Sequence, residues 1–227
     1  MPTFAERYKG PEDLPGELPV FPLRRAILLP RAVLPLNVFE PRYLRMLDDV
    51  MSGDRVLAVV QPSAATDEES PAGKAVALRA VGCVGRVTMY QEFDDGRLGI
   101  ALTGIARCSL LDEIATPAAY RIWRMGFDRF RGDFVAGEGE EDVDRQKLLG
   151  ALKAYLEARN QRADWGAISK SSSESLVNLL AIASPYGAEE KQALLEAPTL
   201  AARADALVAL AEMELAAGAG GSGSTLQ

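Results

Sequence analysis

Residues 81–111 read VGCVGRVTMYQEF at 81–93, DDG at 94–96 and RLGIALTGIARCSLL at 97–111. Both flanking runs are rich in β-branched and apolar residues, and Asp-Gly is a preferred pair in two-residue type I′ hairpin turns. The sequence therefore predicts a long β-hairpin with Asp95-Gly96 as its turn. This register places three apolar pairs across the hairpin: Phe93 with Leu98, Met89 with Leu102, and Cys83 with Cys108.

One face of this predicted hairpin is apolar and the other is mostly polar, which is typical of a half-buried sheet. Both cysteines fall on the apolar face, where cysteine behaves as a small core residue. We therefore expect the Cα atoms of Cys83 and Cys108 to lie about 4.5–5.5 Å apart. Three glycines, Gly85, Gly99 and Gly104, are predicted to mark bulges or barrel corners.

The residues before the hairpin contain short apolar runs punctuated by proline. Runs 18–23 and 34–39 are predicted to be edge or bulged strands, because proline has no N–H to donate to a ladder. Pro41 suits the first turn of a helix, and apolar residues follow it at helical spacing as far as Gly53. Two further strands are expected at 55–61 and 120–130. Residues 62–73 have the composition of a surface loop.

After an acidic stretch at 131–143, the pattern becomes helical. That stretch lacks EF-hand spacing, which favours a solvated linker over a metal site. Ser171 and Glu174 have capping-box spacing at the start of a helix that Pro185 ends, and Thr199 is a plausible N-cap for the last helix. The expected division is an N-terminal arm (1–17), a β subdomain (18–130), an acidic linker (131–143), a helical bundle (144–216) and a disordered Gly/Ser tail (217–227).

Composition excludes several classes of protein. With 48% apolar and 25% charged residues, the chain is neither disordered nor fibrous. The absence of histidine removes the Ser-His-Asp triad and His-ligated metal sites. The net charge of −7 argues against a nucleic-acid partner. No signal peptide or transmembrane run is recognisable, so we expect a cytoplasmic protein with no membrane contact.

No catalytic, metal-binding or cofactor-binding residue is predicted. The sequence lacks a P-loop and a G-x-S-x-G elbow. Ser169-Lys170-Ser171 contains the residue types of a Ser-Lys amidase, but its place before a helix favours a capping role. The carboxylate pairs Asp48-Asp49 and Asp94-Asp95 are expected at the surface.

Several short motifs resemble one known family. Residues 18–23 (LPVFPL), 29–30 (LP) and 35–43 (PLNVFEPRY) resemble the opening signature of the Lon protease N-terminal substrate-binding domain, in the form found in stand-alone bacterial Lon-domain proteins and cereblon-type relatives. Stretches 81–87, 102–107 and 190–196 fit the same group. The resemblance covers about residues 17–215. It implies an α+β fold, in which a six-stranded PUA-like pseudo-barrel with one short helix precedes an α-helical bundle.

The resemblance also implies a function. In Lon proteases this domain recognises and holds client proteins, so we expect a non-enzymatic module that binds unfolded proteins or a dedicated partner, without a cofactor. The ATPase and protease that follow in Lon have no counterpart in this sequence, and we expect neither activity. The signature residues are expected to be structural: Pro19, Pro22, Pro35, Phe39, Glu40, Pro41, Arg42 and Tyr43. Binding would then use other surface, in a cleft between barrel and bundle that carries an apolar patch.

Two other functions stay open. PUA-like barrels elsewhere bind RNA, and a local group of arginines at 24, 25, 31, 42 and 45 would suit such a role. An enzyme with a carboxylate-only site is the third hypothesis, and a deep pocket with convergent acidic groups would favour it.

Overall fold

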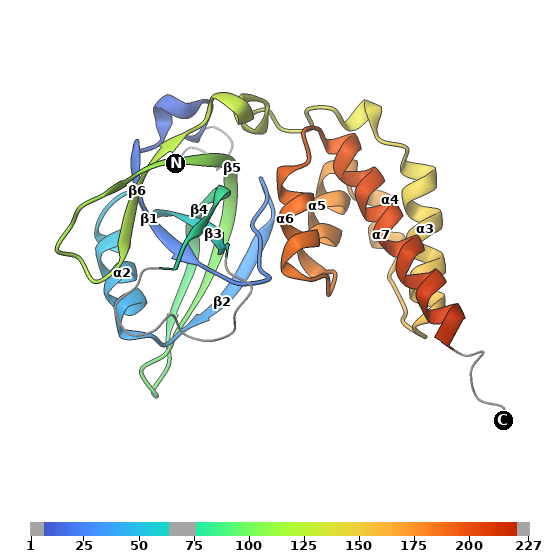
Figure 1. The fold of residues 1–227 in the computed structure, drawn as a ribbon, viewed down its shortest axis with the longest axis horizontal. Helices are drawn as coiled ribbons and strands as arrows, with labels where there is room; N and C mark the ends of the chain where they lie inside the picture. Colours follow the sequence, from blue (N-terminus) through green and yellow to red (C-terminus); the bar gives the residue numbers. More distant parts are fainter. Residues whose placement is uncertain (1–6, 64–75, 222–227) are drawn as a thin grey trace.

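The computed structural model describes residues 7–63 and 76–221, with the backbone alone for 218–221. A curled six-stranded mixed sheet precedes a group of helices (Figure 1), so the expected α+β class is confirmed. The strands are β1 (Glu17–Pro22), β2 (Val33–Val38), β3 (Val56–Pro62), β4 (Leu78–Glu92), β5 (Leu98–Ile114) and β6 (Arg121–Gly126). The helices are α2 (Pro41–Ser52), α3 (Arg145–Ala158), α4 (Trp165–Lys170), α5 (Ser173–Ala183), α6 (Ala188–Glu196) and α7 (Leu200–Gly221). Short 3₁₀ helices are η1 (Pro11–Asp13), η2 (Asp128–Phe134) and η3 (Glu140–Asp142).

The sheet forms a pseudo-barrel, which we call the β ring. Its strand order is β2-β5-β4-β3-β1-β6, and an additional β5–β6 pairing closes it. The long strand β5 makes closure possible, because β2 pairs with its first residues and β6 with its last ones. Only the β1–β3 pairing is parallel among the described strands.

The proline-bearing strands occupy different places in this sheet. The edge prediction for 34–39 is confirmed, because β2 ends the strand order and pairs with β5 alone. The edge prediction for 18–23 is wrong, because β1 lies between β3 and β6. The two pairings of β1 overlap only at Val20, so Pro19 and Pro22 each have a paired neighbour on one side. A missing N–H can then face the unpaired side.

The predicted hairpin is present, but its register is shifted by one residue. The Phe93 N–H donates to the Arg97 carbonyl, and Gly96 has a φ of +83°. The loop therefore contains three residues rather than two, with glycine in the left-handed conformation. As a result, Cys83 lies opposite Arg107, and Cys108 lies opposite Gly82. The predicted Cys83–Cys108 cross-strand pair is wrong.

Two bulges modify the hairpin further. One lies between Val84 and Gly85, where β5 carries the extra residue Ile105, and the other leaves Thr88 unopposed. Gly85 and Gly104 flank the first bulge, as expected, whereas Gly99 is paired in regular register. A Cβ at Gly104 would lie 2.0 Å from the Leu29 carbonyl oxygen. Register shift and bulges together change which side chains are buried. Met89 and Phe93, expected in the core, are 51% and 38% exposed.

Two clusters of buried apolar residues hold the fold together. The main cluster includes Cys83 of β4 and Leu195 of α6, so it is continuous from the β ring to the helices. The second cluster contains Cys108, together with Tyr8 and Leu14 from the segment expected to be an N-terminal arm. Both cysteines are fully buried and unpaired. Because one core spans the acidic stretch, the division into two domains stays a prediction.

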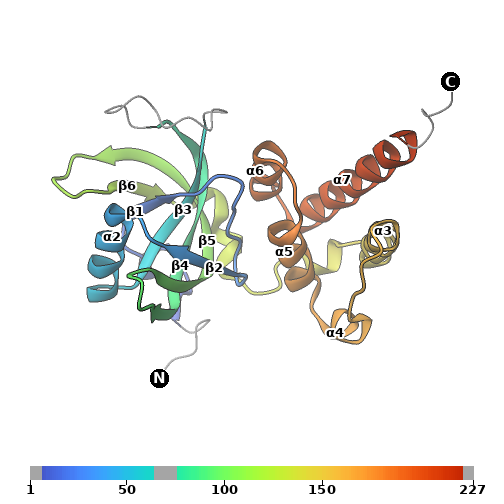
Figure 2. The same ribbon diagram turned by 90° about the horizontal axis from the view of Figure 1, so that it is seen from below.

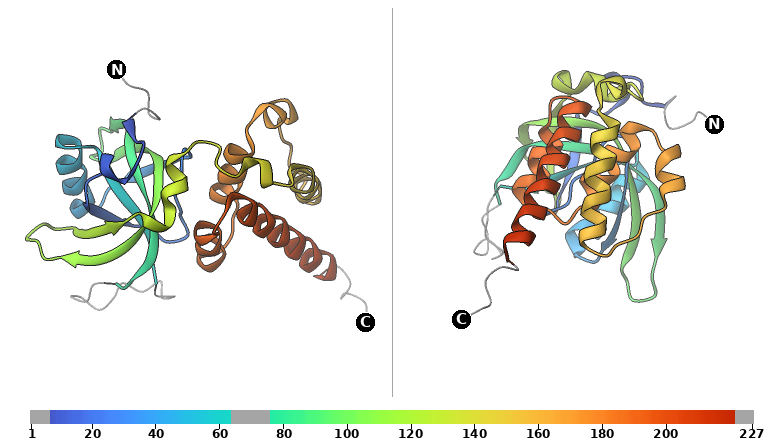
Figure 3. Two further views of the ribbon diagram at one scale, coloured as in Figure 1. Left: turned by 90° about the horizontal axis from the view of Figure 1, so that it is seen from above. Right: turned by 90° about the vertical axis from the view of Figure 1, so that its right-hand side faces the viewer.

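Helices α3 to α7 form the helical bundle, which lies beside the β ring (Figures 1 and 3). The expected helix ends at Pro41, Gly53 and Pro185 are confirmed, and the Thr199 hydroxyl accepts the Ala202 N–H as expected of an N-cap. None of the described helices combines the length and hydropathy needed to cross a bilayer.

Three details of the helical half differ from expectation. The N-cap of α5 is Ser172 rather than Ser171, because its hydroxyl accepts the Ser175 N–H. Helix α4 was not expected. Helix α7 continues to Gly221, five residues into the predicted disordered tail. Residues 222–227 of that tail, and most of the predicted loop at 62–73, lie outside the described residues.

Candidate functional site

The family-signature segment surrounds the start of α2. Pro41 is the first helical residue, and the Glu40 carboxylate pairs with the Arg42 guanidinium at 2.8 Å (Oε2–Nη2). That guanidinium lies 4.6 Å from the centroid of the Tyr43 ring. Tyr43 is buried and packs against Phe21, with ring centroids 4.5 Å apart. Burial raises the pKa of the Tyr43 hydroxyl, while the positive charge of Arg42 lowers it by less.

The remaining signature residues are dispersed over the sheet. Pro19 and Pro22 are partly exposed in β1, and Pro35 is exposed in the middle of β2. Phe39 follows β2 and is 65% exposed. The eight residues therefore form no single pocket, and a structural role for them stays a prediction.

The junction between β ring and helical bundle is packed at the place where we expected a cleft. Arg107 of β5 pairs with Asp133 of η2 at 2.8 Å (Nη2–Oδ1), and their side chains are only 7% and 11% exposed. The Arg107 guanidinium also donates to the backbone carbonyls of Leu195 and Ala197, at the end of α6. One arginine thus joins three segments. Asp133 contradicts the expectation that the acidic stretch is solvated.

Other polar side chains cross the same junction. Arg31, just before β2, forms a bidentate pair with Glu174 in the first turn of α5. Asn178 of α5 and Gln192 of α6 donate to backbone carbonyls of the β ring, at 3.0 and 3.1 Å. Buried hydrogen bonds of this kind favour one arrangement of the packed elements.

Strands β2, β5 and β4 lie side by side (Figure 2), and several side chains on one of their faces are exposed. The buried residues Ile100 and Leu102 point into the main cluster. The residues that alternate with them along β5, and the partners of those residues in β2 and β4, therefore lie on the opposite face. We call this the open face. It carries four exposed large apolar residues: Val33 (54%), Phe39 (65%), Met89 (51%) and Phe93.

Small residues in β5 form the floor of the open face. A Cβ at Gly99 would lie 2.9 Å from the Phe93 ring, so that ring rests directly on the glycine. Ala101 lies between Pro35 of β2 and Met89 of β4. The open face is therefore a shallow surface beside the free edge of β2, on which the apolar side chains are interleaved with the polar Asn37, Gln91 and Thr103.

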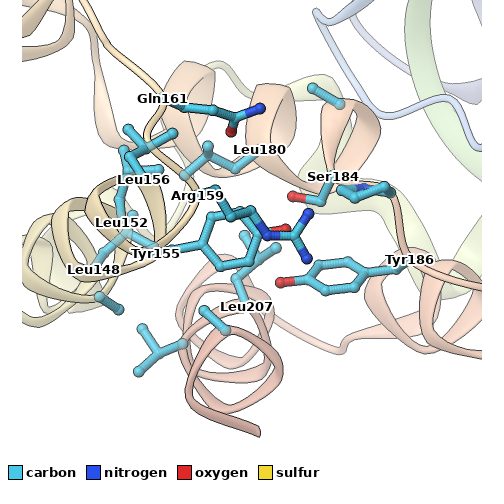
Figure 4. A pocket seen from close by; sticks show the side chains of 15 residues that line it. Leu148, Leu152, Tyr155, Leu156, Arg159, Gln161, Leu180, Ser184, Tyr186 and Leu207 are labelled. Atoms are coloured by element: carbon cyan, nitrogen blue, oxygen red, sulfur yellow. The ribbon is translucent and has the colours of Figure 1, made fainter. Parts of the chain in front are cut away.

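A separate cavity of about 360 Å³ lies between helices of the bundle and is partly open to solvent. Its walls come from α3, the end of α5 and α7, and the loop before α6 contributes Pro185 and Tyr186. Figure 4 shows the side chains of Tyr155, Arg159 and Tyr186 close together on one side of it. The apolar lining residues include Leu148, Leu152, Leu156, Leu180, Leu207 and Val208.

The described residues contain little that could perform catalysis. Burial raises the pKa of the Cys83 thiol well above its ordinary value and that of Cys108 to about 12, which makes both poor nucleophiles. The Ser171 hydroxyl donates to a backbone carbonyl of α4. Described residues include no group of three or more Cys, Asp or Glu placed to hold a metal ion. The lining of the cavity contains no carboxylate.

Sequence reasoning missed the open face, the junction and the cavity. Met89 and Phe93 were assigned to the core because the register was one residue off. Arg107 and Asp133 are 26 positions apart, and neither had a signal that pointed to the other. An aspartate within a glycine-bearing stretch is ordinarily solvent-exposed.

Comparison with known proteins gives a consistent result. The family described as the ATP-dependent protease La (LON) substrate-binding domain matches residues 17–212. Lon protease 2 of Myxococcus xanthus is 28% identical over 200 residues, covering 85% of this chain and 23% of that protein. Lon protease of Anaeromyxobacter dehalogenans is 29% identical over 194 residues, covering 85% and 22%. The chain thus spans about a quarter of the length of the curated relatives it matches.

Two solved structures share the fold. The crystal structure of a Lon N-terminal domain protein from Xanthomonas campestris has a TM-score of 0.57 at 20% identity and covers 85% of this chain and 97% of that one. The N-terminal domain of a Mycobacterium avium complex Lon protease has a TM-score of 0.61 at 16% identity, covering 86% and 98%. With the match over residues 17–212, this chain belongs to the family of Lon substrate-binding domains.

Proposed function

We propose that this chain is a non-enzymatic, cytoplasmic protein-binding module whose open face holds extended apolar segments of unfolded proteins. Family membership supports a protein ligand, since the family is named for substrate binding and its matched relatives are proteases. The observation that carries the proposal is the gathering of four exposed large apolar side chains on one face of three strands.

Because of a proline in the free edge of β2, we expect side chains rather than strand pairing to dominate this binding. An exposed edge can add a strand from another chain. Pro35 stands in the middle of β2 and supplies no N–H, which blunts that mode of binding. The apolar side chains beside the edge remain exposed, so we expect binding to follow the apolar content of the client rather than its sequence.

The expected affinity is modest. Fully burying a Phe or Met side chain stabilises by about 1.5–3 kcal/mol, so covering the exposed parts of Phe39 and Met89 contributes roughly 1–2 kcal/mol each. Association first costs several kcal/mol of lost freedom. Dissociation constants in the micromolar range or weaker, no tighter than roughly −8 kcal/mol, are therefore expected.

The test uses a permanently unfolded client, reduced and carboxymethylated α-lactalbumin carrying a fluorescent label. Fluorescence anisotropy gives its dissociation constant with the wild-type chain and with the double variant Phe39→Ser/Met89→Ser. Both positions are exposed, so the variant should fold. We expect at least a tenfold weaker complex, since about 2–3 kcal/mol of apolar burial is removed.

Leu179→Ser is the matched control, because Leu179 is 60% exposed on α5 and belongs to the helical bundle, not to the three strands of the open face. It should leave the dissociation constant within about twofold. Equal affinity of the wild type and the double variant would contradict the assignment of the open face. A similar loss in the Leu179→Ser control would do the same, by showing that any exposed apolar side chain suffices.

Salt separates this proposal from RNA binding. Apolar binding should survive 0.5 M salt, whereas RNA affinity falls steeply with salt concentration. Three of the five arginines that suggested a basic patch are paired with carboxylates: Arg31 with Glu174, Arg42 with Glu40 and Arg45 with Asp49. No observation favours RNA or a carboxylate-only enzyme as a second function. ATP or casein turnover above a buffer blank would contradict the non-enzymatic assignment.

A further inference from the structure

We propose that the cavity in the helical bundle is a second ligand site, which takes one or two large apolar side chains of an uncharged protein segment. The choice of a peptide as ligand rests on the proposed protein-binding function. The site itself rests on separate observations: the shape of the bundle, the cavity volume and the polar groups at its rim.

The cavity exists because two helices pack on the same third helix but not on each other. Helices α3 and α5 both pack on α7 and scarcely approach one another. The ion pairs Arg159–Glu214 and Lys147–Asp205 hold α3 beside α7 along its length. The apolar stripe of α3 is consequently only partly covered, and Leu152 and Leu156 remain half-buried at the cavity wall.

The volume suits apolar side chains. An apolar cavity of about 150 Å³ in a protein core binds benzene, and ligand pockets generally begin near 300 Å³. At about 360 Å³, this cavity has room for two groups the size of an aromatic ring or a leucine side chain. A client residue inserted here would meet leucine and valine methyls on three sides.

The polar rim indicates a ligand without net charge. The Arg159 guanidinium at the rim lies 4.5 Å from the Tyr155 ring centroid, and the Glu214 carboxylate, which lies outside the lining, neutralises its charge. A ligand carboxylate would compete with Glu214, and a ligand ammonium would meet Arg159. An uncharged ligand avoids both conflicts.

The hydroxyls at the rim add a hydrogen-bonding requirement. The Tyr155 hydroxyl is buried without a well-aligned hydrogen bond, and burial together with the neighbouring Glu214 carboxylate raises its pKa. A buried hydroxyl without a well-aligned acceptor is unfavourable, and a ligand carbonyl would accept a hydrogen bond from it. Tyr186 brings a second hydroxyl to the same side of the cavity (Figure 4). An apolar side chain packs against the apolar walls, and the backbone carbonyls beside it accept hydrogen bonds from the hydroxyls at the rim. A peptide supplies both groups.

The experiment is methyl NMR titration of the full chain with N-acetyl-leucyl-phenylalaninamide, and in a parallel arm with octanoate. We expect the dipeptide to shift the methyl signals of Leu152, Leu207 and Val208 with a dissociation constant of roughly 0.1–1 mM. Ala151→Leu fills the cavity from α3 and should weaken binding roughly tenfold. Ala183→Leu narrows the same cavity from α5, and Ala154→Leu adds the same side chain on the exposed face of α3 as control.

Binding weakened by both filling variants and kept by the control supports the proposal, and unchanged binding in the filling variants overturns it. No methyl shift with the dipeptide overturns it, and shifts with octanoate alone overturn the choice of a peptide in favour of a lipid-like ligand. The two proposals can fail separately. If dipeptide shifts appear on the open face and none in the cavity, the cavity proposal fails and the protein-binding function stands. If the cavity takes the dipeptide but the wild-type chain does not hold unfolded α-lactalbumin, the proposed function fails and the cavity site stands.

Discussion

Replacing Asp133 by asparagine should destabilise the whole molecule, because this side chain neutralises an arginine at the centre of the junction. The variant keeps the size of the side chain and one acceptor oxygen, but it removes the negative charge beside Arg107. Arg107 is 6% exposed and cannot turn to water without unpacking the junction. Breaking a buried ion pair by removing one partner costs about 3–5 kcal/mol. Since Arg107 keeps its hydrogen bonds to the two carbonyls at the end of α6, we expect the free energy of unfolding to fall by about 3 kcal/mol, the lower end of that range.

Urea denaturation measures this loss in each half of the molecule separately. The two tryptophans are Trp123 in β6 and Trp165 in α4, so the variants Trp165→Phe and Trp123→Phe report on the β ring and the helical bundle in turn. Because the main cluster spans both, the two probes should give the same midpoint, and Asp133→Asn should lower both together.

The control is the double variant Arg107→Met/Asp133→Leu. Replacing both charges by apolar residues of similar size is often neutral for stability, so its free energy of unfolding should lie within about 1–2 kcal/mol of the wild type. The reasoning would be refuted by a loss below about 1 kcal/mol in Asp133→Asn, or by a shift confined to one tryptophan.

Two further predictions concern the helices. Burial lowers the pKa of Lys191 to about 8, so between pH 8 and about 10.4 the unfolded chain binds more protons than the folded one, and stability rises with pH there. The free energy of unfolding should therefore rise by about 1 kcal/mol more in the wild type than in Lys191→Met when the pH is raised from 7.5 to 9. A difference between the two proteins that does not change with pH would contradict this. Ser172→Ala should lose about 1 kcal/mol as the N-cap of α5, while Ser171→Ala should lose under about 0.5 kcal/mol; the reverse order of losses, measured by thermal unfolding, would restore the predicted cap.

The fold class was predictable because its signals are local and repeated. The helix after Pro41, helix 188–196 and the hairpin around Gly96 each follow from a few neighbouring residues. The register failed because Asp94-Asp95-Gly96 can form either a two-residue or a three-residue loop, and the choice between them changes every facing pair. The bulge at Thr88 was equally invisible, since no local signal in the sequence marks the extra residue that β4 carries there.

The candidate sites were not predictable from local patterns, because each is made by elements far apart in the chain. The junction joins Arg107 to Asp133 and to the end of α6, and the cavity joins α3 to α7. Periodicity indicates which side of a helix is apolar, but it does not indicate whether a neighbour covers that side. Leu152 of α3 has the same pattern as a core residue and is only half-buried.

The distribution of polar and apolar contacts also argues where binding can occur. Opening the junction to form a client cleft would separate Arg107 from Asp133 and Arg31 from Glu174, and would leave Asn178 without its carbonyl partner. Losing one such buried hydrogen bond costs about 1–3 kcal/mol, and several would have to break at once. Weak apolar binding cannot supply that free energy. A client is therefore expected on surfaces that already lie open, such as the open face of the sheet and the cavity of the bundle.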